Sequence, residues 1–246
     1  EHQFDVNAQD SNGSTPLYHI NTTDTRVLTR KQLEIVEYIL SQNPDITIFP
    51  AGRYSYFLWF KFAFNLRICS ILKDMPGFDA TLKSYYGNTA LHVSSAETVK
   101  FFLEIPGVDP NAKNGIGNTP LQMEPCVKER IEALLSDERV EFAYNSSKGE
   151  MPWPHSIKDL TILRLFFEDK RMPSITREEA ESLIQKIYVQ YHSAPNPECL
   201  VDVAFIVYSR AGYTVDDIFE RHIPRDGKFF QSFHRKLFQC NSTKSA

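Results

Sequence analysis

The residues that could do chemistry are scattered along the chain and form no familiar catalytic or metal-binding pattern. The seven histidines stand at positions 2, 19, 92, 155, 192, 222 and 234, and the four cysteines at 69, 126, 199 and 240. These spacings contain neither HExxH nor the CxxC pairs that hold zinc, so we predict no metal site and no cofactor. A Cys–His nucleophile pair needs only spatial proximity, so His234 with Cys240 and His222 with Cys199 stay open as alternatives.

The paired carboxylates are better explained by helix structure than by acid–base catalysis. Glu178-Glu179 and Asp216-Asp217 each begin a predicted helix, where negative charge complements the helix dipole. No phosphate-binding glycine loop and no GxSxG nucleophile motif follows a strand-like segment. We therefore predict that the protein is not an enzyme, with the C-terminal part as the one region where this stays open.

Composition excludes several classes of protein. The chain has 246 residues, 42% hydrophobic and 24% charged, with a net charge of −4. These values are typical of one or two globular domains and argue against nucleic acid as a partner. The most apolar stretch, 54–66, contains Lys61 and is far shorter than the roughly 20 residues of a membrane-spanning helix, so no transmembrane segment is predicted. The chain begins without Met or an apolar run, and we expect a cytoplasmic fragment that lacks a signal peptide.

Two series of apolar residues repeat along the first 172 residues. One series consists of pairs that close amphipathic runs, and the other follows each pair by five or six residues. The pairs are Ile39-Leu40, Ile71-Leu72, Phe102-Leu103, Leu134-Leu135 and Phe166-Phe167, and the later residues are Ile46, Phe78, Val108, Val140 and Met172. Both series keep steps of 30 to 32 residues over five cycles, which indicates a stacked repeat.

Each repeat predicts a helix followed by a tight turn. Leu33, Val36 and Leu40 have helical spacing, whereas Pro76-Gly77 and Pro106-Gly107 cannot continue a helix. A single unit of this kind buries its apolar face only by stacking on its neighbours. The sequence therefore predicts an all-α fold.

Three segments resemble the turn that opens an ankyrin repeat. They are DSNGSTPL at 10–17, YGNTALH at 86–92 and GNTPL at 117–121, while DVNA at 5–8 and DPNAK at 109–113 resemble the link between repeats. A period of about 33 residues and a Thr-Pro-Leu-His core are the signature of this family. The resemblance implies an ankyrin-repeat solenoid of about five repeats over 1–172, followed by a C-terminal helical module at 173–246. We expect the repeats at 1–47, 48–80, 81–112, 113–144 and 145–172.

The resemblance also implies contact and modification sites. The family's contact positions fall on Ser11, Asn12, Ser14, Tyr85, Tyr86, Asn88, Gly115, Ile116 and Asn118. The adjacent tyrosines offer rigid contact area at low entropic cost, and the alternative is that they cover the second unit, where residues 51–64 replace the usual turn. His92 is expected to hydrogen-bond a neighbouring turn. Asn7 and Asn111 resemble the asparagine that ankyrin proteins offer to the oxygen-sensing asparaginyl hydroxylase; the alternative is that Asn111 shapes the turn.

The period stops after Met172. Thr176 and Glu179 form a capping box before a helical stripe that ends near Tyr191. Residues 200–208 predict a buried helix, with a strand as the alternative, and 214–222 and 229–238 predict two more helices. These elements are interpreted as a helical cap or as a degenerate extension of the repeats. The segment 221–246 is basic and rich in aromatics, which favours either a solvated helix face or contact with a membrane surface.

The function implied by the resemblance is a non-catalytic scaffold for protein–protein interaction. It binds a partner protein, of unknown identity, through hairpin tips and the concave face of the repeats. The alternative is a substrate-recruiting domain of an enzyme whose catalytic part is the C-terminal module or lies outside this chain. The composition also resembles ankyrin effectors that intracellular bacteria secrete, which would place the protein in the host cytoplasm.

Overall fold

The computed structural model describes residues 4–20, 28–48, 50, 57–123, 127–142, 159–191, 197–214 and 217, and the side chains of these residues outside 186–201. The chain divides into two compact units, 1–141 and 142–246, each of which has its own internal contacts. All regular elements among the described residues are helices. This agrees with the predicted all-α fold.

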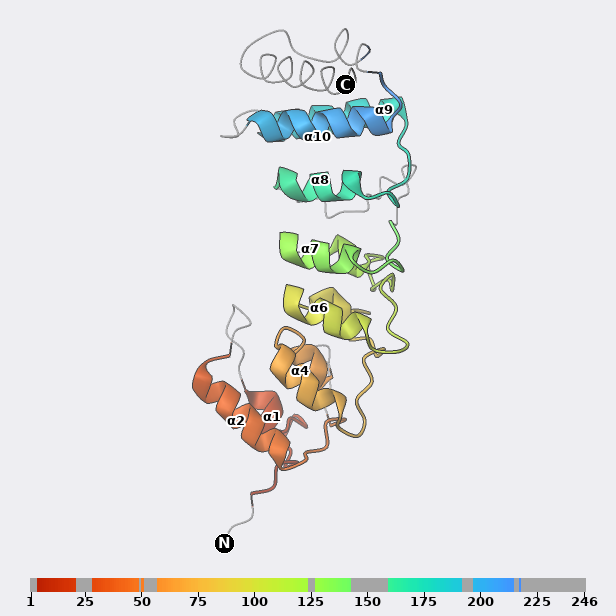
Figure 1. Cartoon of the computed structure of the whole chain (residues 1–246). Helices are drawn as coiled ribbons and strands as arrows, with labels where there is room; N and C mark the ends of the chain where they lie inside the picture. The colour runs from red at the N-terminus through yellow and green to blue at the C-terminus, as the bar shows by residue number, and fades with distance from the viewer. Residues whose placement is uncertain are drawn as a thin grey trace. The chain divides into compact units, whose positions relative to one another are not determined.

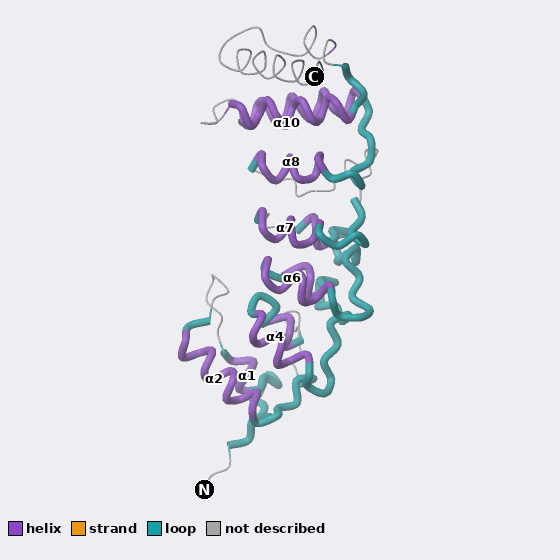
Figure 2. The backbone as a smooth tube through the Cα atoms, in the orientation of Figure 1, coloured by secondary structure: helices purple, strands orange, loops and turns teal. Residues whose placement is uncertain are grey.

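Short and longer helices alternate in the first unit (Figure 1). The short helices are α1 (Pro16–His19), α3 (Leu58–Lys61), α5 (Ala90–Val93) and the 3-10 turn η1 (Pro120–Gln122). The longer helices are α2 (Arg30–Ser41), α4 (Leu66–Lys73), α6 (Ala96–Leu103) and α7 (Lys128–Leu135). Each longer helix contacts the next, and α5 contacts both α3 and η1. The connections that follow α4, α6 and α7 lie on one side of the unit (Figure 2).

The repeated apolar pairs lie at the C-terminal ends of the longer helices, as their spacing predicts. Ile39 and Leu40 end the buried stripe of α2, and Phe102 and Leu103 end that of α6. The turns that follow α4 and α6 contain Gly77 and Gly107, both at φ +85°. This backbone conformation is costly for residues with a Cβ atom.

The second unit consists of α8 (Leu160–Glu168), α9 (Arg177–Tyr191) and α10 (Pro197–Arg210). Both α8 and α9 contact α10. Residues 200–208 are therefore helical, and the strand alternative is wrong. The capping box forms as predicted, because the Thr176 N–H donates to a Glu179 carboxylate oxygen at 2.7 Å. The predicted helix at 229–238, most of that at 214–222, and the basic segment 221–246 lie outside the described residues.

Arginine side chains close the turns after α6 and α8 in a similar way. The acceptors are the carbonyls of Leu103 and Val108 for Arg139, and those of Phe167 and Met172 for Arg210. These four acceptors are corresponding members of the two repeated series. Arg139, in the turn after α7, thus bonds to the turn after α6. Arg210, at the end of α10, bonds to the turn after α8 in the same way.

A chain that ends at residue 172 is expected to be less stable and less soluble than the full chain. The shorter chain lacks α10, which α8 contacts in the intact unit, and each large apolar side chain that loses its cover costs about 1.5–3 kcal/mol of burial energy. Thermal unfolding of both chains measures the difference, and a chain that ends at residue 214 serves as the control because it keeps α9 and α10. Equal melting temperatures for the 172-residue and full chains would rule out a covering role for α10.

Candidate functional site

Three turns in the first unit have the same hairpin geometry. They span residues 10–14, 84–88 and 114–118. In each, the first N–H donates to the fifth carbonyl and the fourth N–H donates to the first carbonyl, over 2.8–3.0 Å. The fourth residue is Gly13, Gly87 or Gly117, with φ between +73° and +89°, which glycine adopts at low cost. The resemblance of these three segments in sequence is therefore matched by their backbone structure.

Two hydrogen bonds join the second and third of these hairpins directly, and two more come from Lys83 and His92 beside them. The bonds are Gly115 N–H to Tyr86 O at 2.8 Å, Asn114 Nδ2 to Asn88 Oδ1 at 2.8 Å, Lys83 Nζ to Lys113 O at 3.2 Å, and His92 Nε2 to Asn118 O at 3.0 Å. A Cβ atom at Gly115 would lie 2.9 Å from Tyr86 O, so only glycine permits this approach. The two hairpins thus form one pre-organised surface, which we call the paired-hairpin surface (83–88 and 113–118).

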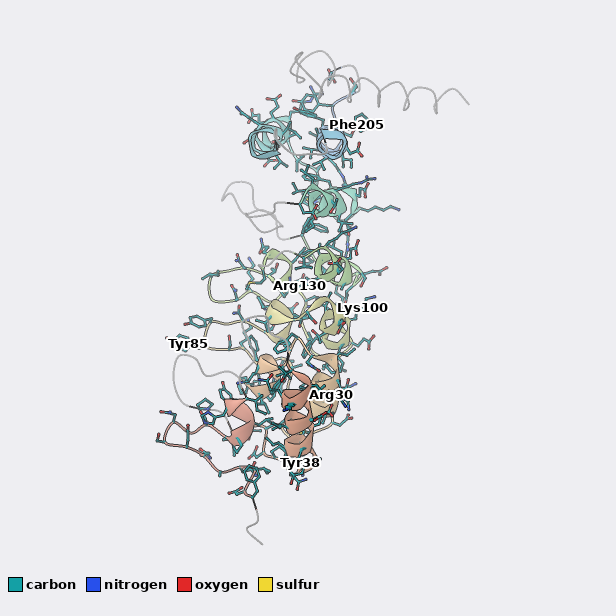
Figure 3. All side chains as sticks on the ribbon, turned by 90° about the vertical axis from the view of Figure 1, so that its left-hand side faces the viewer. Arg30, Tyr38, Tyr85, Lys100, Arg130 and Phe205 are labelled. Carbon is teal, nitrogen blue, oxygen red and sulfur yellow. The ribbon has the colours of Figure 1, made fainter. Side chains whose placement is uncertain are left out.

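Three large apolar side chains project from the paired-hairpin surface. Tyr85, Tyr86 and Ile116 are 64%, 54% and 80% exposed. The two tyrosine rings lie edge to face with their centroids 5.3 Å apart. Figure 3 shows Tyr85 at the outer end of its hairpin, away from the helices. Large apolar groups that stay exposed on a rigid turn are typical of contact residues.

The other sequence-predicted contact residues differ in exposure. Ser11 and Asn12 are exposed on the first hairpin, and Gly115 is exposed on the third. Asn88 and Asn118 are half-buried and hold the paired hairpins together. Ser14 is only 9% exposed, because it lies at the foot of its hairpin, where its N–H bonds to Asp10. Ser14 therefore offers little surface to a partner, and its role as a contact residue stays a prediction.

His92 supports the paired hairpins from below. Its Nδ1 accepts from the Thr89 N–H at 3.0 Å, and its Nε2–H donates to Asn118 O. These partners assign the neutral tautomer that carries hydrogen on Nε2. Burial lowers the pKa of His92 to about 4; the bond to Asn118 opposes this shift, and the charges of Arg130 and Lys83 add to it. The predicted bond from His92 to a neighbouring turn is confirmed.

Acidification from pH 6.5 to pH 4 is expected to destabilise the protein through His92. In this window the unfolded chain takes up a proton that the folded chain does not, because the folded pKa lies below the usual 6.5. Stability should therefore be full above pH 6.5 and fall by roughly 3 kcal/mol by pH 4. Denaturant titrations at several pH values measure this dependence.

The variant His92→Gln is the matched control for this pH dependence. Gln122 of η1 corresponds to His92 of α5, and its side-chain oxygen accepts from the Thr119 N–H at 3.0 Å. The variant should keep the hydrogen bond from the Thr89 N–H and lose most of the pH dependence between 6.5 and 4. If its stability fell as steeply as that of the wild type, another group would be responsible.

A buried cation, Arg130, lies beside the neutral His92. Arg130 of α7 is 6% exposed, and Figure 3 shows it between the two rows of helices. Its guanidinium donates to the carbonyls of Leu91, Ser94 and Pro120 at 2.9, 3.0 and 2.9 Å. Leu91 belongs to α5, Ser94 follows α5 and Pro120 belongs to η1, so Arg130 ties α7 to the backbone of both short helices.

The side chains of Asn7 and Asn111 each hydrogen-bond to the backbone of a turn further along the chain. The Asn111 side chain donates to Arg139 O at 2.6 Å and accepts from the Glu141 N–H at 2.8 Å. The Asn7 side chain accepts from the Asp45 N–H at 2.8 Å. The two asparagines thus have the turn-shaping role that was the alternative for Asn111, and their hydroxylation stays a prediction.

The structure adds candidate contact residues that the sequence analysis missed. Lys83 and Lys113 are exposed and each directly precedes one of the paired hairpins, a regularity that is visible in the sequence. Ile35 and Tyr38 of α2 are 51% and 61% exposed. Together they form a second apolar surface, which we call the α2 surface.

The described residues contain no candidate metal centre, and their one described cysteine side chain is buried. No group of three or more His, Cys, Asp or Glu side chains in this part of the chain could hold a metal ion. Cys69 is buried, and burial raises its pKa to about 12, which removes the thiolate needed for nucleophilic attack. The Cys–His pairs left open by the sequence lie outside the described side chains. Nor is any helix in the described ranges both long and apolar enough to span a membrane.

Comparison with known families identifies the segment that contains α5 and α6. Residues 86–115 match the family model of the ankyrin repeat. The match begins at Tyr86 on one of the paired hairpins and ends at Gly115 on the other, and it supports an ankyrin repeat protein. Ankyrin repeats are in general modules for protein–protein interaction. No curated protein matches the chain significantly.

Proposed function

We propose that the protein is a non-catalytic scaffold that binds a partner protein. The binding site is the paired-hairpin surface, with the concave face beside it, in an ankyrin-repeat solenoid of about five units. The observation that carries this proposal is the exposure of Tyr85, Tyr86 and Ile116 on two hairpins that four hydrogen bonds hold in place. Binding to such a surface costs little conformational entropy, because the surface is ordered before the partner arrives.

The continuation of the repeats into the second unit is part of this proposal. The bonds of Arg210 to the turn after α8 correspond to those of Arg139 to the turn after α6. This correspondence favours a degenerate extension of the repeats over an unrelated module. The cytoplasmic location and the role of a bacterial effector rest on composition alone, and the family match adds no support for them.

Quantitative affinity purification from cell lysate tests the proposed function. The wild-type chain should recover a partner that the double variant Tyr85→Ala/Tyr86→Ala recovers much less well. The variant Tyr38→Ala is the matched control, since Tyr38 is as exposed as the paired tyrosines but lies on α2. Equal recovery by the double variant and the wild type would move the binding site elsewhere.

We further propose Asn111 and Asn7 as substrates of the asparaginyl hydroxylase that modifies ankyrin proteins. The position of Asn111 at the end of a repeat and its resemblance to the family's asparagine support this. Because its side chain bonds to Arg139 and Glu141, the enzyme must open this turn first. Mass spectrometry after incubation with the hydroxylase should show the mass of one added oxygen on the Asn111 peptide and none on the Asn118 peptide. An unmodified Asn111 peptide would contradict the proposal.

A further inference from the structure

The paired-hairpin surface carries two positive charges and contains no negative charge of its own. Lys83 and Lys113 are exposed, and the segments 83–88 and 113–118 contain no Asp or Glu. Within the described part of the chain neither lysine forms an ion pair. Arg67 and Arg139, by contrast, are paired with Glu37 and Asp137.

The nearest carboxylates in the sequence are occupied by their own turns. Asp79 accepts from the backbone N–H of Thr81 at 2.9 Å and from its hydroxyl at 2.6 Å. Asp109 accepts from the Asn111 N–H at 2.8 Å. Lys83 also contributes to the lowered pKa of the buried His92, so its positive field extends into the protein beneath the hairpins. The surface therefore carries two ammonium groups, without an ion pair in the described part of the chain, beside its apolar side chains.

The two lysines and the three apolar side chains belong to one continuous surface. The bond from Lys83 Nζ to Lys113 O places the two lysine residues next to each other, and the bond from Gly115 to Tyr86 does the same for the two tips. On the basis of the proposed function, we propose that the partner segment is an acidic peptide with an apolar anchor. Its anchor contacts Tyr85, Tyr86 and Ile116, while its carboxylates pair with the two lysines.

Electrostatic complementarity sets the expected behaviour of this interface. Exposed ion pairs raise the association rate and fix the register of a partner, and salt screens them. Affinity for an acidic segment should therefore fall as ionic strength rises, whereas an interface made by the tyrosines alone would change little. Reversal of the lysine charges should repel the same segment.

Selection from a random peptide library displayed on phage tests the inference. Peptides are selected on the wild-type chain and counter-selected on Tyr85→Ala/Tyr86→Ala, so that only binders of the paired-hairpin surface survive. Asp and Glu should be enriched around a large apolar residue. The affinity of a selected peptide should fall about tenfold or more for Lys83→Glu/Lys113→Glu, and also between about 0.05 and 0.5 M salt.

Two further variants make the result decisive. Lys31→Glu/Lys100→Glu changes the net charge equally on the longer helices α2 and α6 and should bind normally. Lys83→Gln/Lys113→Gln removes the charge without reversal and should show an intermediate loss. Neutral or basic peptides, or undiminished binding by Lys83→Glu/Lys113→Glu, would overturn the acidic partner while leaving the proposed function intact. A library that yields no peptide able to distinguish the wild type from the tyrosine variant would contradict both.

Discussion

Replacement of Tyr85 and Tyr86 together by alanine is expected to weaken partner binding by about 30- to 1,000-fold. Both side chains are more than half exposed, so the free protein gains little from them, whereas a partner that covers them gains most of their apolar area. Calorimetric titration of the partner measures the affinity, and thermal unfolding of the same variant measures the cost to the fold. The melting temperature should change little, because residues at turn tips contact few core atoms.

The contrast between binding and stability distinguishes the two roles that the sequence allows for these tyrosines. A large drop in melting temperature with unchanged affinity would mean that they cover the second unit. Tyr38→Ala supplies the comparison, since it removes an equally exposed ring from α2. Its effect on affinity should be small.

Replacement of Arg130 by methionine is expected to lower the free energy of unfolding by about 2–4 kcal/mol. Methionine fills much of the same volume, but it leaves the carbonyls of Leu91, Ser94 and Pro120 without their charged donor. A buried acceptor that loses its partner costs more than the bond itself contributes. Denaturant unfolding, followed by circular dichroism, measures the change.

Arg67→Met is the matched control for Arg130→Met. Arg67 has the corresponding place in α4, five residues before the end of the apolar pair, but its side chain is 68% exposed and pairs with Glu37. Surface ion pairs of this kind contribute about 0–1 kcal/mol, so the control should be nearly neutral. Similar losses for the two variants would show that burial of Arg130 is not the cause.

The sequence predicts the helices of the first unit well because their signals are local. The paired apolar residues and the proline–glycine turns both act within a few residues of where they occur. Whether a side chain is buried depends instead on how the neighbouring helices pack against it. The position five residues before the end of each apolar pair is occupied by Ile35 in α2, Arg67 in α4, Thr98 in α6 and Arg130 in α7. Ile35 and Arg67 are exposed, whereas Thr98 and Arg130 are buried. No local pattern separates them, so the buried role of Arg130 could not be predicted.

The candidate site was predicted in part for the same reason. Tyr85, Tyr86 and Ile116 could be placed on exposed tips because a following glycine marks each turn. The burial of Ser14 follows from contacts at the foot of its hairpin. The pairing of the two hairpins depends on the close approach of Gly115 to Tyr86, which only the three-dimensional arrangement reveals. The unpaired state of Lys83 and Lys113 was hidden in the same way.

Hydrogen–deuterium exchange of the protein with and without its partner shows which segments the partner covers. We expect slower exchange on binding at residues 84–88 and 114–118, where Tyr86 and Gly115 join the two hairpins. Exchange in α2 should stay the same, although Ile35 and Tyr38 are also exposed there. Protection confined to α2 or to residues 221–246, with the paired hairpins unchanged, would show that the partner binds elsewhere.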